Sequence, residues 1–173
     1  LYVFTRLALL RVLVGSDAMA QELSQDAYDR LTVELEDLRT HGRIDMADKI
    51  ERAREHGDLK ENAEYHAAKE EKAKMEARVA QLFGILEDAT IVEIGGSSDE
   101  VRVGTLVSLR YDGDDEDEVE QFLVGSIEEA GAGMDVISPT SALGEALLGA
   151  KVGQSVSYQA PNGSLTVVVV SLG

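Results

Sequence analysis

Two long segments with helical periodicity, joined by a very short glycine-containing turn, constrain this chain more than any other feature of its sequence. In the first segment, from Ser24 toward Glu55, charged residues separate apolar residues that recur at spacings of three and four, the pattern of a coiled-coil seam. His41-Gly42 weakens the pattern locally, and helical spacing resumes after it. The apolar positions are Tyr28, Leu31, Leu35, Leu38, Met46, Ile50 and Ala53.

The second segment predicts a helix from about Leu59 to Asp88. Gly57 lies between the two and predicts the end of the first helix, because glycine readily takes the left-handed conformation found there. Two helices joined so closely bury both stripes only by folding back antiparallel, and each arm is about 45 Å long at 1.5 Å per residue. The second stripe consists of Ala63, Ala67, Met75, Val79, Leu82 and Leu86.

Acidic side chains gather in the turn of this predicted hairpin. Asp58 and Glu61 fit a capping box, with Asp58 as the N-cap and Glu61 reaching back from the third helical position. The same spacing presents both carboxylates on one helix face. Paired carboxylates suit Mg²⁺, which completes its shell with water and phosphate oxygens. The pair would hold Mg²⁺ weakly by itself, so a metal role requires a partner that supplies the remaining ligands. The residues alone leave both interpretations open.

Composition excludes several kinds of site. The 173 residues contain no cysteine, which excludes a disulfide framework, a thiolate metal site and a cysteine nucleophile. A net charge of −17 opposes direct binding to nucleic acid or anionic lipid, because phosphates attract clustered Lys and Arg. Residues 1–88 carry 13 basic and 19 acidic side chains, whereas residues 89–173 carry 3 and 14. Any nucleic acid is therefore expected to be met indirectly.

The first residues form an apolar run that Arg6 and Arg11 interrupt. The run is too short and too charged to span a bilayer, and we expect it to be an extension upstream of a natural start at Met19. The predicted organisation is this extension (1–18), a coiled-coil hairpin domain (19–93), a linker (94–100) and a C-terminal domain (101–173).

Beyond the linker the hydrophobic period changes to that of β-strands. Strands are expected within 101–111, 120–127, 134–137, 154–159 and 165–172, and a short helix over 141–148. The acidic run Asp112 to Glu118 predicts a solvated hairpin loop, since it lacks the ligand spacing of an EF-hand. The fold class is therefore α+β, with an antiparallel helical hairpin followed by a small antiparallel sheet and one helix.

The run AREHGDLKENAEYHAAKEE, from Ala53 to Glu71, resembles the hairpin-tip signature of the bacterial transcription elongation factors GreA and GreB nearly residue for residue. The segment 136–149 resembles the family's SP-x-S-P-L-G-x-A-L-L-G segment, so the resemblance covers essentially 19–173. It implies an FKBP-like C-terminal domain and a hairpin that enters the secondary channel of bacterial RNA polymerase. Two tip carboxylates there help to hold the second catalytic Mg²⁺, and the matching positions are Asp58 and Glu61.

On this resemblance the chain is not an enzyme, since the polymerase itself cleaves its backtracked transcript and the hairpin only supplies carboxylates. Supporting roles are expected for Arg54 at an RNA phosphate, Asn62 in orienting a carboxylate or water, and Tyr65 in stacking on a base. Ordinary support of the turn is the alternative for each. The expected docking residues on the channel rim are Ser138, Pro139, Ser141, Leu143, Gly144 and Leu147. Two departures from the family pattern, Ala142 and Glu145, fall among them.

Three functions are compared. A transcript-cleavage factor is favoured because both tip acids are present, and the GreA type is preferred because the hairpin lacks a large basic surface. Lys69, Lys72 and Lys74 are expected instead to pair with glutamates along the helix. The second function is a channel-binding inhibitor with the same fold, and the third is a plain coiled-coil adaptor, which leaves the tip match unexplained. We expect a cytoplasmic monomer without membrane contact, which meets the nascent RNA 3′ end and DNA only within the elongation complex.

Overall fold

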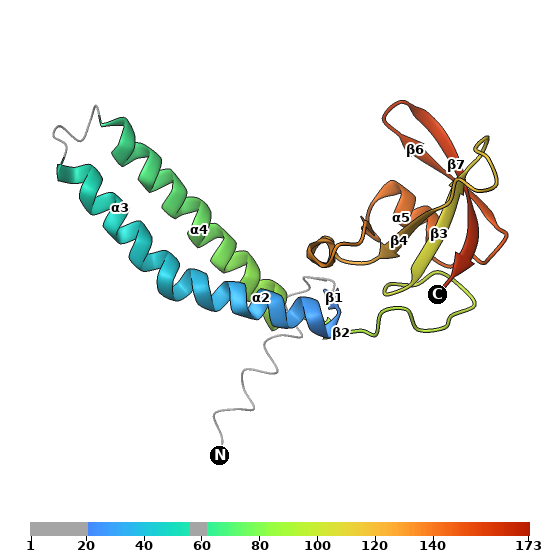
Figure 1. Cartoon of the computed structure of the whole chain (residues 1–173), viewed down its shortest axis with the longest axis horizontal. Coiled ribbons are helices and arrows are strands. Elements are labelled where there is room, and N and C mark those ends of the chain that lie inside the picture. The colour runs from blue at the N-terminus through green and yellow to red at the C-terminus, as the bar shows by residue number, and fades with distance from the viewer. Residues whose placement is uncertain (1–20, 56–61) are drawn as a thin grey trace, which may run out of the picture.

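The computed structural model describes residues 21–55 and 62–173, which form a two-armed helical hairpin followed by a β-sheet domain (Figure 1). The predictions for the upstream extension, for Gly57 and for the two tip acids, Asp58 and Glu61, lie outside the described residues.

The first arm is helical from Gln25 to Glu55, as predicted. It consists of α2 (Gln25–Asp37), one π-helical turn η1 (Leu38–Gly42) and α3 (Arg43–Glu55). Ser24 caps it, with its Oγ accepting the Ala27 N–H at 3.0 Å. The π turn lies where His41-Gly42 weakened the hydrophobic pattern. A Cβ at Gly42 would lie 3.0 Å from Sδ of Met75 on the other arm, so glycine permits a close approach of the helices there.

The second arm, α4 (Ala63–Glu87), begins four residues later than predicted. Its N-cap is Asn62, whose Oδ1 accepts the Tyr65 N–H at 3.0 Å. The N-cap of α4 is therefore Asn62 and not the predicted Asp58, and the capping box between Asp58 and Glu61 lies outside the described residues. Asparagine is suited to this position because its side-chain amide also carries an N–H donor, which binds a backbone carbonyl of the opposite arm. An ionised aspartate has no such donor.

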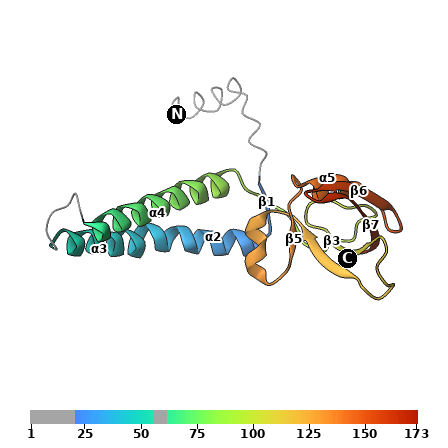
Figure 2. The same ribbon diagram turned by 90° about the horizontal axis from the view of Figure 1, so that it is seen from above.

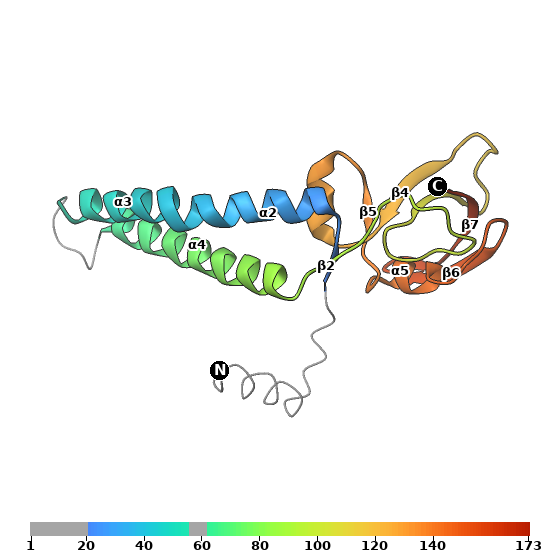
Figure 3. The same ribbon diagram turned by 90° about the horizontal axis from the view of Figure 1, so that it is seen from below.

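The two arms pack antiparallel (Figures 1 and 3). Their largest buried side chains lie near the base. Toward the tip, Ala53 and Ala68 are the buried positions among the described residues, whereas Ala63 and Ala67 of the predicted stripe are exposed. Exposed ion pairs Arg43–Glu76 and Lys49–Glu71 also link the arms, with N···O distances of 2.9 and 2.7 Å. The buried residues at the base are Leu23, Ala27, Leu31, Leu35 and Leu82.

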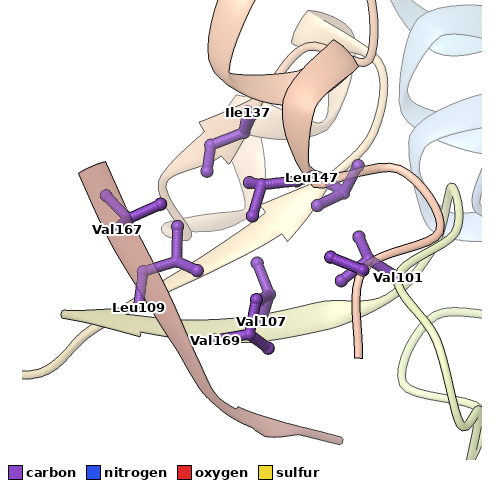
Figure 4. Packing of buried hydrophobic residues seen from close by; sticks show 9 residues of the cluster. Val101, Val107, Leu109, Ile137, Leu147, Val167 and Val169 are labelled. Carbon is purple, nitrogen blue, oxygen red and sulfur yellow. The ribbon is translucent and has the colours of Figure 1, made fainter. Parts of the chain in front are cut away.

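The C-terminal domain is a five-stranded sheet in the order β5-β4-β3-β7-β6. Leu147 of α5 (Ala142–Leu147) fills the curl of the sheet and packs against Val107, Val167 and their neighbours (Figure 4). The strands are β3 (Leu106–Tyr111), β4 (Glu120–Val124), β5 (Val136–Ile137), β6 (Ser155–Ala160) and β7 (Gly163–Leu172).

These observations confirm the α+β class, and three local details differ from the prediction. The short edge strand β5 runs parallel to β4, because the 3-10 helix η2 (Ile127–Ala132) carries the chain back before the two strands pair. Residues 101–105 are irregular rather than a strand. A two-residue parallel ladder of β1 (Glu22–Leu23) and β2 (Thr90–Ile91) closes the hairpin base, and nothing in the sequence indicated it. Within 21–55 and 62–173, no helix combines the length and apolar character needed to cross a membrane.

Neighbouring residues on α4 test where the hairpin derives its stability. Leu82 is 0% exposed and Phe83 is 55% exposed. Leu82→Ala should lower the free energy of unfolding of the hairpin by about 2–5 kcal/mol, because it leaves a cavity between the arms. Phe83→Ala should cost less than about 1 kcal/mol. Thermal unfolding followed by helical circular dichroism measures both, and equal losses would contradict a base-centred core.

Candidate functional site

One side chain ties together the ends of the two arms at the hairpin tip. The Nδ2 of Asn62 donates to the backbone oxygen of Ala53 on α3 at 2.6 Å. The Oδ1 of the same amide accepts the Tyr65 N–H at 3.0 Å and so begins α4. Ala53 itself is buried between the arms. The amide thus fixes where α3 and α4 stand relative to each other on either side of the turn that contains Asp58 and Glu61.

Tyr65 lies at the centre of a cluster of cationic and aromatic side chains just below this amide. The guanidinium carbon of Arg54 is 5.9 Å from the Tyr65 ring centroid, and Nζ of Lys69 is 5.6 Å from it. Both distances lie within the range of cation–π attraction. The His66 ring meets the Tyr65 ring edge-on, with 5.8 Å between centroids. The structure therefore brings together Arg54, Asn62 and Tyr65, the three residues predicted to support the tip acids.

Lys69 is a tip residue that the sequence analysis assigned a different role. It was expected to pair with glutamates along the helix, but it lies near the Tyr65 ring, one helical turn away. Only the Lys74–Glu70 pair, at 2.8 Å, is observed as expected among the described residues. The spacing of four from an aromatic residue was the signal that indicates this contact.

An open groove of about 660 Å³ runs between the arms below the tip. Its charges are mixed, because Arg54, Lys69 and Lys72 share its walls with Glu51 and Glu76. A hydrogen bond from Arg43 lowers the pKa of Glu76 below its ordinary value. Glu76 therefore stays ionised at neutral pH and offsets part of the positive charge of the groove.

The described residues contain no group of three His, Cys, Asp or Glu side chains placed to share a metal ion. Asp58 and Glu61 are outside these residues, so the Mg²⁺ site assigned to them stays a prediction.

The predicted docking segment is held in shape by a tight turn in front of α5. Ser141 Oγ donates to the Ser138 oxygen at 2.8 Å and accepts the Gly144 N–H at 3.0 Å, capping the helix. A Cβ on Gly144 would lie 2.0 Å from the Ser138 oxygen, so only glycine permits this packing. Leu147 is fully buried and Leu143 packs against the same core. Gly144 and Leu147 thus shape the segment from within, whereas Ser141 is exposed.

Two exposed apolar residues beside this segment were not predicted. Ile127 is 65% exposed and Leu148 is 42% exposed. Together with Ser138 and Pro139 they line a cleft of about 330 Å³, which also reaches Gln21 and Glu22 at the hairpin base. Leu147 and Leu148 are adjacent at the end of a short helix, so their side chains must point in different directions. This spacing could have predicted that Leu148 is exposed when Leu147 is buried. Ile127 was predicted within a strand and lies in η2 instead.

Substitutions of Asn62 separate its two hydrogen bonds. Asn62→Ala removes both and should lower hairpin stability by about 1–2 kcal/mol. Asn62→Asp keeps the acceptor for the Tyr65 N–H but loses the donor to Ala53. Amide hydrogen exchange distinguishes them, since Tyr65 should lose protection in the alanine variant and keep it in the aspartate variant. Similar exchange of Tyr65 in both variants would contradict the assignment of Asn62 as the helix cap.

Comparison with known proteins assigns both parts of the chain to one family. The family described as "Transcription elongation factor, N-terminal" matches residues 21–91, and "Transcription elongation factor, GreA/GreB, C-term" matches residues 96–173.

Individual relatives agree with this assignment. Transcription elongation factor GreA of Streptomyces avermitilis is 45% identical over 148 residues, covering 86% of this chain and 89% of the relative. GreA of Mycolicibacterium smegmatis is 40% identical over 157 residues, covering 90% and 94%. The crystal structure of GreA factor homolog 1 (Gfh1) of Thermus thermophilus is 32% identical, covering 88% of this chain and 98% of that chain with a TM-score of 0.39. The family expected from the tip signature is confirmed, and the chain belongs to the GreA/GreB family of transcription elongation factors.

Proposed function

We propose that this elongation factor inserts its hairpin into the secondary channel of bacterial RNA polymerase and stimulates cleavage of backtracked RNA. The observation that carries the proposal is the construction of the tip, where the Asn62 amide ties the two arms and the turn between them contains the family's two acids. A turn anchored on both sides suits the presentation of carboxylates at a fixed place. The small side chains buried between the arms near the tip, Ala53 and Ala68, suit a rod that enters a channel.

Asp58 and Glu61 are proposed to share a Mg²⁺ ion with the polymerase. Such an ion activates water and neutralises charge at a scissile phosphate. Arg54 and Lys69, which lie at the Tyr65 ring, are suited to an RNA phosphate near the tip. Because protein cations already contact the Tyr65 ring, base stacking would have to use whatever part of the ring they leave free. On this proposal the bond-breaking site belongs to the polymerase, and the chain is a protein cofactor rather than an enzyme.

The segment around α5 is proposed to dock on the rim of the channel. Its half-buried members Ser138 and Pro139 line the cleft that contains Ile127 and Leu148, and Ser141 is exposed beside them. Apolar side chains at the centre of a polar rim are typical of a protein interface. The factor would act as a cytoplasmic monomer and meet the RNA 3′ end and DNA only within the elongation complex. Its strongly acidic C-terminal half would discourage binding to free nucleic acid.

Cleavage by a stalled, backtracked elongation complex with end-labelled RNA tests the metal role. With Mg²⁺ present, the protein should shorten the transcript, and Asp58→Asn and Glu61→Gln should each reduce the rate by at least about 100-fold, as expected when a charge-stabilising group is lost. Because α4 begins at Ala63, neither change should alter its helicity. Glu64→Gln is the matched control, since it removes an exposed carboxylate from the first turn of α4 and should leave cleavage unchanged.

Full cleavage activity of Glu61→Gln would contradict the proposed role of Glu61 in binding Mg²⁺. An inactive parent protein that still binds the polymerase and slows RNA synthesis would favour the channel-binding inhibitor instead.

Two glycine-to-alanine changes test the docking segment. At Gly144 the added methyl group collides with the Ser138 backbone, so the turn must move and affinity for the polymerase should fall about tenfold or more. At Gly84 on α4 a Cβ meets nothing within 4 Å, and alanine should stabilise the helix by about 0.5–1 kcal/mol without weakening binding. The affinity of both variants for core polymerase is the measurement. Parent-like affinity of Gly144→Ala would exclude the segment around α5 as the docking surface.

A further inference from the structure

The hairpin and the sheet domain meet through polar contacts. The buried apolar cluster of the hairpin contains only residues between Leu23 and Ala89, and that of the sheet only residues between Val101 and Leu172. In the described part of the chain neither cluster includes a residue of the other domain. Figures 2 and 3 show where the domains touch, with η2 against the start of α2. Hydrophobic attraction has no direction, so hydrogen bonds must set the angle between the domains here.

The first of these contacts joins Glu129 of η2 to the cap of α2. Its carboxylate accepts the Ser24 N–H at 2.7 Å and the Ser24 Oγ–H at 2.8 Å. Glu129 is only 3% exposed, and the two residues are 105 positions apart in the sequence. A buried carboxylate at a helix N-terminus is held by both hydrogen bonds and the helix dipole. This contact attaches the sheet domain to the start of the first arm.

The second contact joins the adjacent Glu128 to both arms. The guanidinium of Arg78, on α4, binds both oxygens of Glu128 at 3.0 Å and also binds Glu34 of α2 at 2.8 and 3.0 Å. These hydrogen bonds raise the pKa of Arg78 above its ordinary value. Arg30 donates to the backbone oxygen of Glu128. A planar guanidinium gripping two carboxylates fixes orientation as well as distance.

The length of the hairpin makes this angle consequential. From Ser24 to Glu55 the first arm rises about 45 Å at 1.5 Å per residue. At that radius a tilt of about 1° moves the tip by nearly 1 Å, a misplacement that costs a catalytic arrangement up to about 100-fold. Small errors at the base would therefore become large errors at the tip.

We propose that Glu128 and Glu129 are positioning residues, which hold the hairpin at one angle to the sheet domain and thereby place the tip carboxylates. Their effect on cleavage rests on the proposed function, whereas their effect on the angle does not. Both act through Ser24 and Arg78 and contact none of the predicted tip residues.

The test compares two doubly substituted proteins that lose the same charge. Glu128→Gln with Glu129→Gln weakens the contacts to Arg78 and Ser24 and keeps the hydrogen bond between Gln21 and Ser126. Glu36→Gln with Glu116→Gln removes one exposed carboxylate from each domain, and neither residue takes part in the bonds of Ser24 or Arg78 to the two glutamates. Because the chain has no cysteine, spin labels on Asp48→Cys and Lys151→Cys, both exposed, report a single distance between the domains in the full-length protein.

The label distance should be narrowly distributed in the parent and the control. In the Glu128→Gln, Glu129→Gln protein it should shift or broaden by several ångströms with helicity retained, and transcript cleavage should fall about tenfold or more while polymerase affinity changes little. Should this protein unfold, Glu128→Gln alone carries the test, because Glu128 is the less buried of the two.

An unchanged distance distribution would overturn the role of these glutamates at the junction. A broadened distribution with parent-like cleavage would overturn their positioning of the tip. Failure of the parent to stimulate cleavage would reject the proposed function, and the distances would still decide the junction.

Discussion

A hairpin of two helices has one packing interface, and the position of its tip depends on how the two arms are held together along that interface. At the base, Leu31, Leu35 and Leu82 exclude water and supply the apolar burial that a hairpin requires. Toward the tip the seam consists of alanines, which bury little area and provide little hydrophobic attraction. The arms are held there by directional contacts instead, namely exposed ion pairs and the Asn62 amide.

The described residues near the tip therefore rely on few buried apolar groups. Exposed ion pairs contribute little free energy each, because water screens them and long side chains lose entropy. The partly buried amide of Asn62 constrains the geometry more than these ion pairs do, because it bonds Ala53 on one side of the turn and Tyr65 on the other. Larger apolar residues would hold the arms more strongly, but they would also thicken the end that is proposed to enter a channel.

Periodicity predicted the hairpin, the sheet domain and the short helix, because each depends on local spacing that the chain displays directly. It predicted the wrong cap for α4, because Asp58 and Asn62 have nearly equal cap preference and the deciding contact, to Ala53, lies across the turn. The tip resemblance pointed to Arg54, Asn62 and Tyr65, which lie near one another in the structure, but not to Lys69, whose neighbouring glutamates offered a plausible alternative partner. The junction between Ser24 and Glu129 was beyond sequence reasoning, because nothing local relates residues 105 positions apart.

The two ends of the hairpin both use polar contacts where apolar packing would leave the geometry loosely defined. Apolar burial stabilises the middle of each domain, but it specifies angles poorly, and both places where an angle matters use hydrogen-bonded polar groups. At the tip a neutral amide suffices, because the antiparallel arms already pack along their length and only their ends need fixing. At the base a lever must be held against the whole sheet domain, and charged groups do this through the stronger, bidentate bonds of Arg78 and the buried carboxylate of Glu129. The acidic character of the C-terminal half thus has a local structural use, since two of its glutamates meet the arms of the hairpin.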